Sequence, residues 1–342
     1  MSAVAARLAD GRLHLQHGPI DLIVEAFGDE AEVEESYRQA IARFGDILPT
    51  LVRELAILRR PVGQAYPLLQ GPVARRMADA VWPHRAVYIT PMAAVAGAVA
   101  DEMLQALVNG RALDKAYVND GGDIAIHLSP GNELRAGIFA SALDGVARLT
   151  HDQPVRGIAT SGWGGRSLSL GIADSATVLA KTGAAADAAA TLIANAVNVD
   201  HPAIRRQAAR LLDPDSDLGD LPVTVSVGDL PDDAIAQALD KGLAEARRLR
   251  LLGLIEGAAL SLRGQWRIET GGMALARMEA GWRFSQGGSR GARCLHGRPQ
   301  SRRRGGRECQ LPFSARPPGE RQGHRLAIAG RLQAQGFLCP RR

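Results

Sequence analysis

The sequence predicts an α+β fold in which central antiparallel strands are packed by helices. Strand-like and helix-like segments alternate along residues 1–280, and several strand-like segments follow one another in the middle of the chain. Hydrophobic residues make up 46% of the sequence but aromatic residues only 4%, so the core must be built from Ala, Val, Leu and Ile. The length of 342 residues suits one large domain or two small ones.

The first part of the chain predicts a hairpin followed by helices. The segments RLHLQHG and IDLIVEA alternate or run apolar, which is typical of paired strands. Residues 30–58 have helical spacing that is interrupted near Pro49. The segment AVYIT, residues 86–90, predicts a short strand. Thr90 and Pro91 then predict the N-cap and the first residue of a helix.

The second part of the chain predicts most of the sheet. It begins with a series of strand-like segments, AYVN, DIAIHL, ELRAGIFA, RGIATSG, RSLSLGI and ATVLA. An alanine-rich helix follows at residues 183–197, and then come HPAIRRQAARLL and a strand LPVTVSV. A long helix over residues 231–250 closes the series, and we delimit residues 1–268 as one α+β body.

The C-terminal segment, residues 281–342, differs from the body in composition. It holds 14 arginines, 2 acidic residues and all three cysteines, whereas residues 1–280 carry a net charge of −7. The run SRRRGGRE would suit contacts with RNA phosphates. The alternative is an out-of-frame or otherwise unselected translation of GC-rich DNA, which the ratio of 38 arginines to 3 lysines favours. Either way we predict a basic, low-complexity, disordered tail, and we do not expect nucleic acid as the partner.

The composition of the body excludes several classes of chemistry and location. Residues 1–280 contain no cysteine, so they offer no thiol catalysis, disulfide or cysteine-based metal site. No uninterrupted apolar run reaches about 18 residues, which predicts that no segment spans a membrane. Charges at Arg7, Asp10 and Arg12 interrupt the N-terminus, so we expect no signal peptide and a cytoplasmic location.

The segment VNDGGDIAIHL places two glycines between two strand-like pieces. Gly121 and Gly122 are flanked by Asp120 and Asp123, and Asp-Gly is a strong signal for a hairpin turn. The same residues suit a second interpretation, in which the glycine backbone comes close to a ligand that lies beside a carboxylate. The sequence leaves both interpretations open.

The segment GIATSGWGGRSLSLGIADSATVLA contains a loop of small residues. After Thr160, Ser161 and Gly162, the only bulky side chain in TSGWGG is Trp163. Its N–H groups could cradle phosphate oxygens, or the segment could be a mobile surface loop. Asp174 follows at the end of a strand-like run.

The alanine-rich helix carries one polar stripe. Asp187, Thr191 and Asn195 lie four residues apart, so they share a face, and the many alanines predict close packing of the helix backbone. The stripe is therefore either part of a ligand site or a buried hydrogen-bond network. Carboxylate and hydroxyl oxygens suit Mg²⁺, which completes its shell with water and substrate phosphate.

These motifs together resemble the ApbE superfamily of flavin transferases. The resemblance is carried by GGD, ATSG and ADAAAT, and it is closest to an uncharacterised cytoplasmic branch through the segments TPMAAVAGAVAD, YVNDGGDIAI, HPAIRRQAA and DLGDLPVTVSVG. It spans roughly residues 10–265. The resemblance implies an ApbE-like fold that binds FAD and Mg²⁺, and that transfers FMN to a Thr or Ser of an acceptor protein or hydrolyses FAD.

The resemblance also implies roles for particular residues. It makes Asp187 and Thr191 the metal ligands, with Asp187 and Asp174 as the catalytic residues. The residues that it places against the flavin cofactor are Gly121, Gly122, Asp123, Thr160, Ser161 and Gly162. The transferases carry a stretch similar to HxxDPxTG where this chain has GIADSATV, so only Asp174 matches that stretch.

Two functions follow as expectations. The first is an enzyme, of the FAD:protein FMN transferase kind, that binds the flavin nucleotide with Mg²⁺ and cleaves or transfers across its pyrophosphate, with a soluble protein as the acceptor. The second is a non-catalytic protein on the same fold that binds a ligand or assists cofactor assembly.

Overall fold

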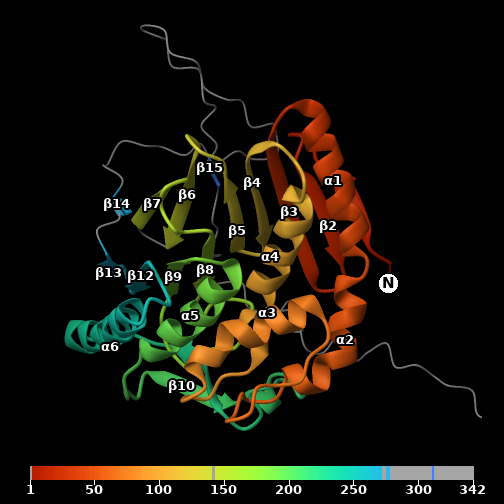
Figure 1. Cartoon of the computed structure of the whole chain (residues 1–342). Helices are drawn as coiled ribbons and strands as arrows, with labels where there is room; N and C mark the ends of the chain where they lie inside the picture. The colour runs from red at the N-terminus through yellow and green to blue at the C-terminus, as the bar shows by residue number, and fades with distance from the viewer. Residues whose placement is uncertain (1, 141–142, 272–274, 278–309, 312–342) are drawn as a thin grey trace, which may run out of the picture.

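The computed structural model describes residues 2–140, 143–271, 275–277 and 310–311 (Figure 1). Its centre is a nine-stranded sheet in the order β1-β2-β3-β4-β5-β8-β9-β12-β13. Every neighbouring pair in this sheet is antiparallel. The structure therefore confirms the predicted α+β fold with central antiparallel strands packed by helices.

The first half of the chain supplies five strands and most of the helices. Their bounds are β1 Val4–Arg7, β2 Leu13–His17, β3 Ile20–Gly28, α1 Glu30–Phe44, α2 Ile47–Leu58, α3 Pro72–Val81, η1 Trp82–His84, η2 Pro91–Ala94, α4 Val95–Val108, β4 Leu113–Asp120 and β5 Asp123–Leu128. The predicted hairpin is confirmed as β2 and β3. The break between α1 and α2 lies at residues 45–46, just before Pro49 in the first turn of α2.

The second half completes the sheet and adds two smaller ones. Its elements are β6 Glu133–Ala140, β7 Leu143–Thr150, β8 Gly157–Ser161, β9 Ser175–Ala180, α5 Gly183–Ala196, β10 Ile204–Ala208, η3 Ala209–Leu211, β11 Pro222–Val227, α6 Asp232–Leu251, β12 Gly257–Leu262, β13 Gln265–Thr270, β14 Leu275–Arg277 and β15 Gln310–Leu311. Strands β10 and β11 pair with each other, and the third sheet has the order β14-β7-β6-β15. Apart from Gln310–Leu311, the predicted tail lies outside the described residues.

Two predicted strands are wrong. Residues 86–90 form bends and turns that lead to the N-cap Thr90, and residues 166–172 form an irregular loop between β8 and β9. Both segments have strand-like hydropathy, but neither pairs with a neighbouring strand as part of a sheet. Thr90 does cap the next helix as predicted, since its hydroxyl accepts the N–H of Met92 at 3.2 Å and Pro91 is the first helical residue.

Side chains alternate between the two faces of the central sheet, and each face is covered by a different layer of the protein. Ala116, Val118 and Ala125 on β4 and β5 point into the core beneath the helices. Tyr117 and Ile124 point to the opposite face, where they meet apolar residues of the β6–β7 hairpin. The helices thus cover one face of the sheet, with α1, α4, α5 and α6 in front of the strands in Figure 1.

Helix α4 with its preceding turn lies at the centre of the helical layer. Among the described residues, Pro91–Val108 is the one segment long and apolar enough to cross a membrane by length and composition alone, and half of it is buried in the protein. It packs against α1, α3, α5 and the strands β4 and β5. Its polar residues are used inside the fold, since Glu102 forms ion pairs with Arg43 and Arg76 at 3.0 Å. The segment is therefore a core helix of this domain.

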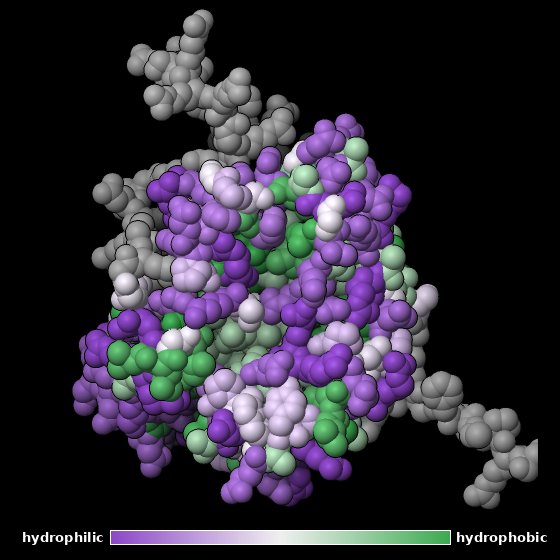
Figure 2. All heavy atoms as spheres, in the orientation of Figure 1, coloured by the Kyte–Doolittle hydropathy of each residue, from purple (hydrophilic) through white to green (hydrophobic). Residues whose placement is uncertain are grey.

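The outer surface of the helical layer is mainly hydrophilic. Figure 2 shows mainly hydrophilic side chains, with apolar ones between them and in a few exposed patches. An apolar hollow lies between α2, α3 and the start of α4, next to the end of β4.

Candidate functional site

The two glycines of VNDGGDIAIHL form the hairpin turn between β4 and β5. Gly121 and Gly122 have φ of 62° and 123°, a backbone conformation that side chains with a β-carbon rarely adopt. The turn pairs Asp120 directly with Asp123 across the ladder. The side chain of Asn119 stabilises it by accepting the N–H of Gly122 at 2.8 Å. The turn interpretation is correct, and it sets two carboxyl groups side by side.

Both carboxyl groups face the helical layer. Asp120 follows Ala116 and Val118 at a spacing of two, and Asp123 precedes Ala125 in the same way, so all lie on the side of the sheet that α4 and α5 cover. Asp123 accepts the backbone N–H of Thr160 on β8 at 3.2 Å.

Helix α5 brings a third carboxyl group to this place. Asp187 lies in the second turn of α5, and its Oδ2 accepts the N–H of Gly97 at the start of α4 at 3.0 Å. Asp123 and Asp120 are both close enough to Asp187 to repel its negative charge. We call Asp120, Asp123 and Asp187 the acidic cluster.

Burial disfavours the ionised form of all three carboxyl groups of the acidic cluster. Burial raises the pKa of Asp120 to about 8 and that of Asp123 to about 7. Burial also raises the pKa of Asp187, with repulsion by Asp123 as the next cause. The guanidinium of Arg166 is the cation that opposes these shifts at Asp120 and Asp123. A further cation at this position would stabilise the ionised carboxylates.

Arg166 reaches the cluster from the loop between β8 and β9. A β-carbon on Gly121 would lie 1.6 Å from its Nη2, so the guanidinium rests directly on the glycine turn. Neither Arg166 nor Asp120 was predicted as a site residue from the sequence. The available signals were that Asp120 precedes the glycine pair and that Arg166 is the one basic residue in a glycine-rich loop.

Among the predicted site residues of the segment that follows β8, backbone groups are closer to the acidic cluster than side chains are. The hydroxyl of Thr160 lies 2.8 Å from that of Thr177 on β9, so it is the N–H of Thr160 that meets the cluster. Ser161 ends β8 and is half-buried. Gly162 is required by packing, because a β-carbon there would lie 2.5 Å from the carbonyl oxygen of Asp174.

The residues of the polar stripe on α5 have different roles. Asn195 accepts the N–H of Leu170 at 2.9 Å and the hydroxyl of Ser169 at 3.2 Å, so it holds the β8–β9 loop in place. Thr191 is half-buried, one turn after Asp187 on the same face. The stripe is a network at its C-terminal end and faces the acidic cluster at its N-terminal end.

Asp174 lies at the entry to β9, and its two oxygens are engaged outside the acidic cluster. Its Oδ1 accepts the indole N–H of Trp163 at 3.2 Å, and its Oδ2 accepts the backbone N–H of Arg263 at 2.6 Å. These bonds tie the β8–β9 loop to the turn between β12 and β13.

The N-terminus of α5 is already capped by protein groups. Asp101 accepts the N–H groups of Gly183 and Ala184 at 2.8 and 2.9 Å, and Thr182 accepts that of Ala185 at 3.1 Å. An anion is therefore not needed at this helix end.

The donor set fits a cation that keeps most of its own shell. Over the part of the chain that the structure describes, no three His, Cys, Asp or Glu side chains converge closely enough to hold a metal ion. Asp187 with Thr191 offers one carboxylate and one hydroxyl, and the carboxyl groups of Asp123 and Asp120 lie close enough to repel a charge on Asp187. That suits Mg²⁺, which usually takes one or two carboxylates and completes its octahedron with water and phosphate.

The match to a family model places the chain in the ApbE-like superfamily, and in its fold the GGD turn of the antiparallel sheet lies against the alanine-rich helix α5. Within it, the chain belongs to the family described as AbpE bacteria, whose model matches residues 5–268. The match ends close to the point where the basic tail begins.

Curated relatives and solved structures extend the comparison. A UPF0280 protein of Methanothrix thermoacetophila is 42% identical over 135 residues, which is 38% of this chain and 54% of that protein. A second, from Methanothermobacter thermautotrophicus, is 38% identical over 133 residues and 50% of its length. The chain thus spans about half the length of the curated relatives it matches.

Two solved structures show a distant likeness. The flavinyl transferase ApbE of Pseudomonas stutzeri, in its apo form, is 12% identical, with 78% of this chain and 93% of that chain covered and a TM-score of 0.40. A variant of the flavin transferase ApbE of Vibrio cholerae is 11% identical, with 79% and 97% covered and a TM-score of 0.39.

Proposed function

We propose that this protein binds FAD together with Mg²⁺ at the acidic cluster and cleaves or transfers across the pyrophosphate of the dinucleotide. The observation that carries the proposal is the convergence of Asp120, Asp123 and Asp187 from three separate elements at a place where burial raises the pKa of each carboxyl group. Membership of the ApbE-like superfamily supports a flavin as the ligand.

In this proposal Asp187 and Thr191 bind the metal ion, and Gly121 and Gly122 let the ligand approach the backbone of the turn. Bound Mg²⁺ would neutralise the pyrophosphate and stabilise the charge that builds up on the leaving phosphate. Asp123, with a pKa of about 7, is suited to accept a proton at a carboxyl oxygen from the attacking hydroxyl or water. We place the reaction in the cytoplasm, with a Thr or Ser of a soluble protein as acceptor, or water.

A non-catalytic ligand-binding or cofactor-assembly protein is the second candidate, and one observation favours it. Asp174, the predicted second catalytic residue, has both oxygens occupied by Trp163 and Arg263. A carboxylate held in this way positions the loop between β8 and β9. The binding function needs only the acidic cluster and the glycine turn.

Titration calorimetry with FAD, with and without Mg²⁺, tests the proposal on the full chain. We expect binding that depends on Mg²⁺, and we expect Asp187→Asn to abolish that dependence without lowering the melting temperature of the ligand-free protein. Thr191→Val should weaken binding less, since it removes a neutral oxygen. Asp200→Asn, an exposed aspartate beyond α5, is the matched control and should bind as the wild type does.

Chromatography of the same mixtures separates the two candidates. Release of AMP from FAD that is lost in Asp187→Asn would support the enzyme, whereas Mg²⁺-dependent binding without AMP would support the binding protein. If wild-type protein does not bind FAD at any Mg²⁺ concentration, both candidates are wrong for this ligand.

A further inference from the structure

Residues 164–168, in the loop between β8 and β9, form a short segment that is anchored on both sides. On one side the backbone N–H of Trp163 donates to the carbonyl oxygen of Ala173 at 3.0 Å. On the other side Asn195 on α5 accepts the backbone N–H of Leu170 at 2.9 Å. We call residues 164–168 the strap, since it runs between two fixed points.

The interior of the strap has few contacts with the rest of the protein. Its first four residues, from Gly164 to Ser167, are exposed, and a β-carbon on Gly164 would meet no atom within 4 Å. Among the described residues, the strap forms a single hydrogen bond, from the N–H of Gly165 to the carbonyl oxygen of Gly162 at 3.1 Å. A segment with so few contacts can change its course while its two anchors stay in place.

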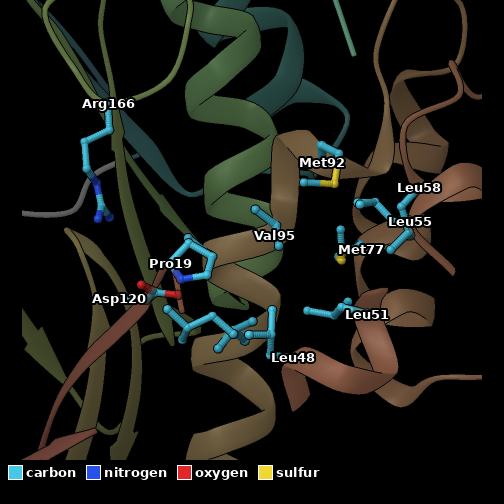
Figure 3. A pocket seen from close by; sticks show the side chains of 13 residues that line it. Pro19, Leu48, Leu51, Leu55, Leu58, Met77, Met92, Val95, Asp120 and Arg166 are labelled. Atoms are coloured by element: carbon cyan, nitrogen blue, oxygen red, sulfur yellow. The ribbon is translucent and has the colours of Figure 1, made fainter. Parts of the chain in front are cut away.

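Arg166, in the middle of the strap, covers the glycine turn between β4 and β5. A β-carbon on Gly121 would lie 1.6 Å from its Nη2 and 2.6 Å from its Cζ, so the guanidinium fills the space directly over that residue. Figure 3 shows the side chain extending from the loop toward Asp120. A ligand that approaches the backbone of Gly121 from this side therefore meets the guanidinium first.

Charge, and no direct bond, holds the guanidinium over the turn. Across the described part of the chain Arg166 forms no hydrogen bond and no ion pair within 4.0 Å. Its positive charge nevertheless opposes the rise in pKa that burial causes at Asp120 and Asp123. Attraction of this kind does not depend on hydrogen-bond geometry, so a divalent cation, with twice the charge, competes with Arg166 for the same carboxylates.

We propose that Arg166 is the resting counter-ion of the acidic cluster, and that a divalent cation which binds the cluster replaces it, so that the strap leaves Gly121 and uncovers the glycine turn. This rests on the proposed function, in which a metal ion binds at Asp187 and a ligand approaches the turn. It adds a regulatory role for the strap, because the glycine turn is covered until the metal ion binds. The guanidinium and the cation repel each other, and the few contacts of the strap let the guanidinium move away.

Titration of the full chain with Mn²⁺ and no nucleotide, followed by electron paramagnetic resonance of the free ion, tests the competition. Only the binding that Asp187→Asn removes is compared. We expect Arg166→Gln to tighten Mn²⁺ binding at least about fivefold, because it removes the competing charge. Arg166→Lys keeps the charge and should bind as the wild type does, and so should the matched control Ser167→Ala, an exposed neighbour on the strap. Equal or weaker binding in Arg166→Gln, or no binding by either protein, would overturn the proposal.

Limited proteolysis of the wild-type chain measures the movement of the strap separately from metal affinity. Trypsin cleaves after arginine, and mass spectrometry of the fragment 1–166 reports cleavage after Arg166. We expect saturating Mn²⁺ to speed this cleavage at least about threefold, since the released side chain reaches the protease more often. Cleavage after Arg210, an exposed arginine paired with Asp220, is the internal control and should not change. Cleavage after Arg166 that is unchanged or slower with Mn²⁺ would show that the strap stays on the turn.

The two experiments contain no flavin, so their failure is distinct from that of the proposed function. If Arg166→Gln tightens Mn²⁺ binding and Mn²⁺ exposes Arg166 while FAD does not bind, the exchange stands and the flavin chemistry is wrong. If FAD binds with Mg²⁺ while Arg166→Gln leaves Mn²⁺ binding unchanged, the proposed function stands and Arg166 is not the resting counter-ion. If neither Mn²⁺ nor FAD binds, both proposals are wrong.

Discussion

Gly97 and Gly183 meet backbone to backbone where α4 crosses α5. A β-carbon on Gly97 would lie 2.2 Å from the carbonyl oxygen of Gly183, closer than side-chain carbons approach backbone in proteins. The N–H of Gly97 is also the group that binds Asp187. One helix crossing therefore fixes both the packing of the layer and the position of a site carboxylate.

The first prediction concerns this crossing. Gly97→Ala should lower the free energy of unfolding by about 1–3 kcal/mol through overpacking, more than the gain of about 1 kcal/mol that alanine brings to a helix interior. Urea denaturation measures the change. Gly63→Ala is the control, since its β-carbon would meet nothing within 4 Å, and a shift within about 0.5 kcal/mol is expected. Equal midpoints for both variants would mean that the two helices are not in contact.

The second prediction is a fall in stability as the pH rises. Asp120 and Asp123 keep their protons in the folded protein up to about pH 8 and 7, whereas the unfolded chain releases them near the ordinary pKa of 3.8. Between these limits the folded state binds more protons, so the free energy of unfolding decreases with increasing pH.

Melting temperatures measured between about pH 5 and pH 8 test whether stability decreases with increasing pH. We expect a higher value at the acidic end, a smaller slope in Asp120→Asn, and partial recovery at pH 8 with Mg²⁺ because the ion neutralises ionised carboxylates. Asp200→Asn should keep the wild-type slope. A melting temperature that rises steadily toward pH 8 would contradict burial of the cluster.

The third prediction separates the two ends of the polar stripe on α5. Asn195→Ala leaves the N–H of Leu170 and the hydroxyl of Ser169 without their acceptor, which should cost about 1–3 kcal/mol in the ligand-free protein. Thr191→Val should change the melting temperature little and act on Mg²⁺-dependent binding. Thermal denaturation without ligand measures the melting temperature of both variants. A larger loss in Thr191→Val than in Asn195→Ala would show that Thr191 is the structural residue.

The fourth prediction concerns the basic tail. A chain that ends after Arg277 keeps β13 and β14 and loses only the two-residue β15 among the described strands. We expect its melting temperature to equal or exceed that of the full chain. A drop of several degrees would show that residues beyond Arg277 stabilise the body, which would contradict an unselected tail.

Local patterns in the sequence predict much of this fold. The strands β2, β3, β5, β6 and β11 and the helix α6 lie where hydropathy alternation or helical spacing indicates, and Thr90 caps its helix because its hydroxyl is a short-range acceptor. Strand-like hydropathy at residues 86–90 and 166–172 predicted two strands that the structure does not contain. A strand also needs a partner strand, which local sequence does not specify. Helix α3 and the strands β7, β12 and β13 were not predicted.

The candidate site was predicted only in part. The sequence alone determined that Gly121 and Gly122 turn the chain between two carboxylates and that Asp187 lies on a closely packed helix, because turn chemistry and helical periodicity act over a few residues. The tertiary structure decided that α5 sets Asp187 against Asp120 and Asp123, that Arg166 covers the glycine turn, and that Asp174 is bound by Trp163 and Arg263. Those contacts join residues up to 89 positions apart along the chain, and only the packing of helices on the sheet brings their charges close enough to interact.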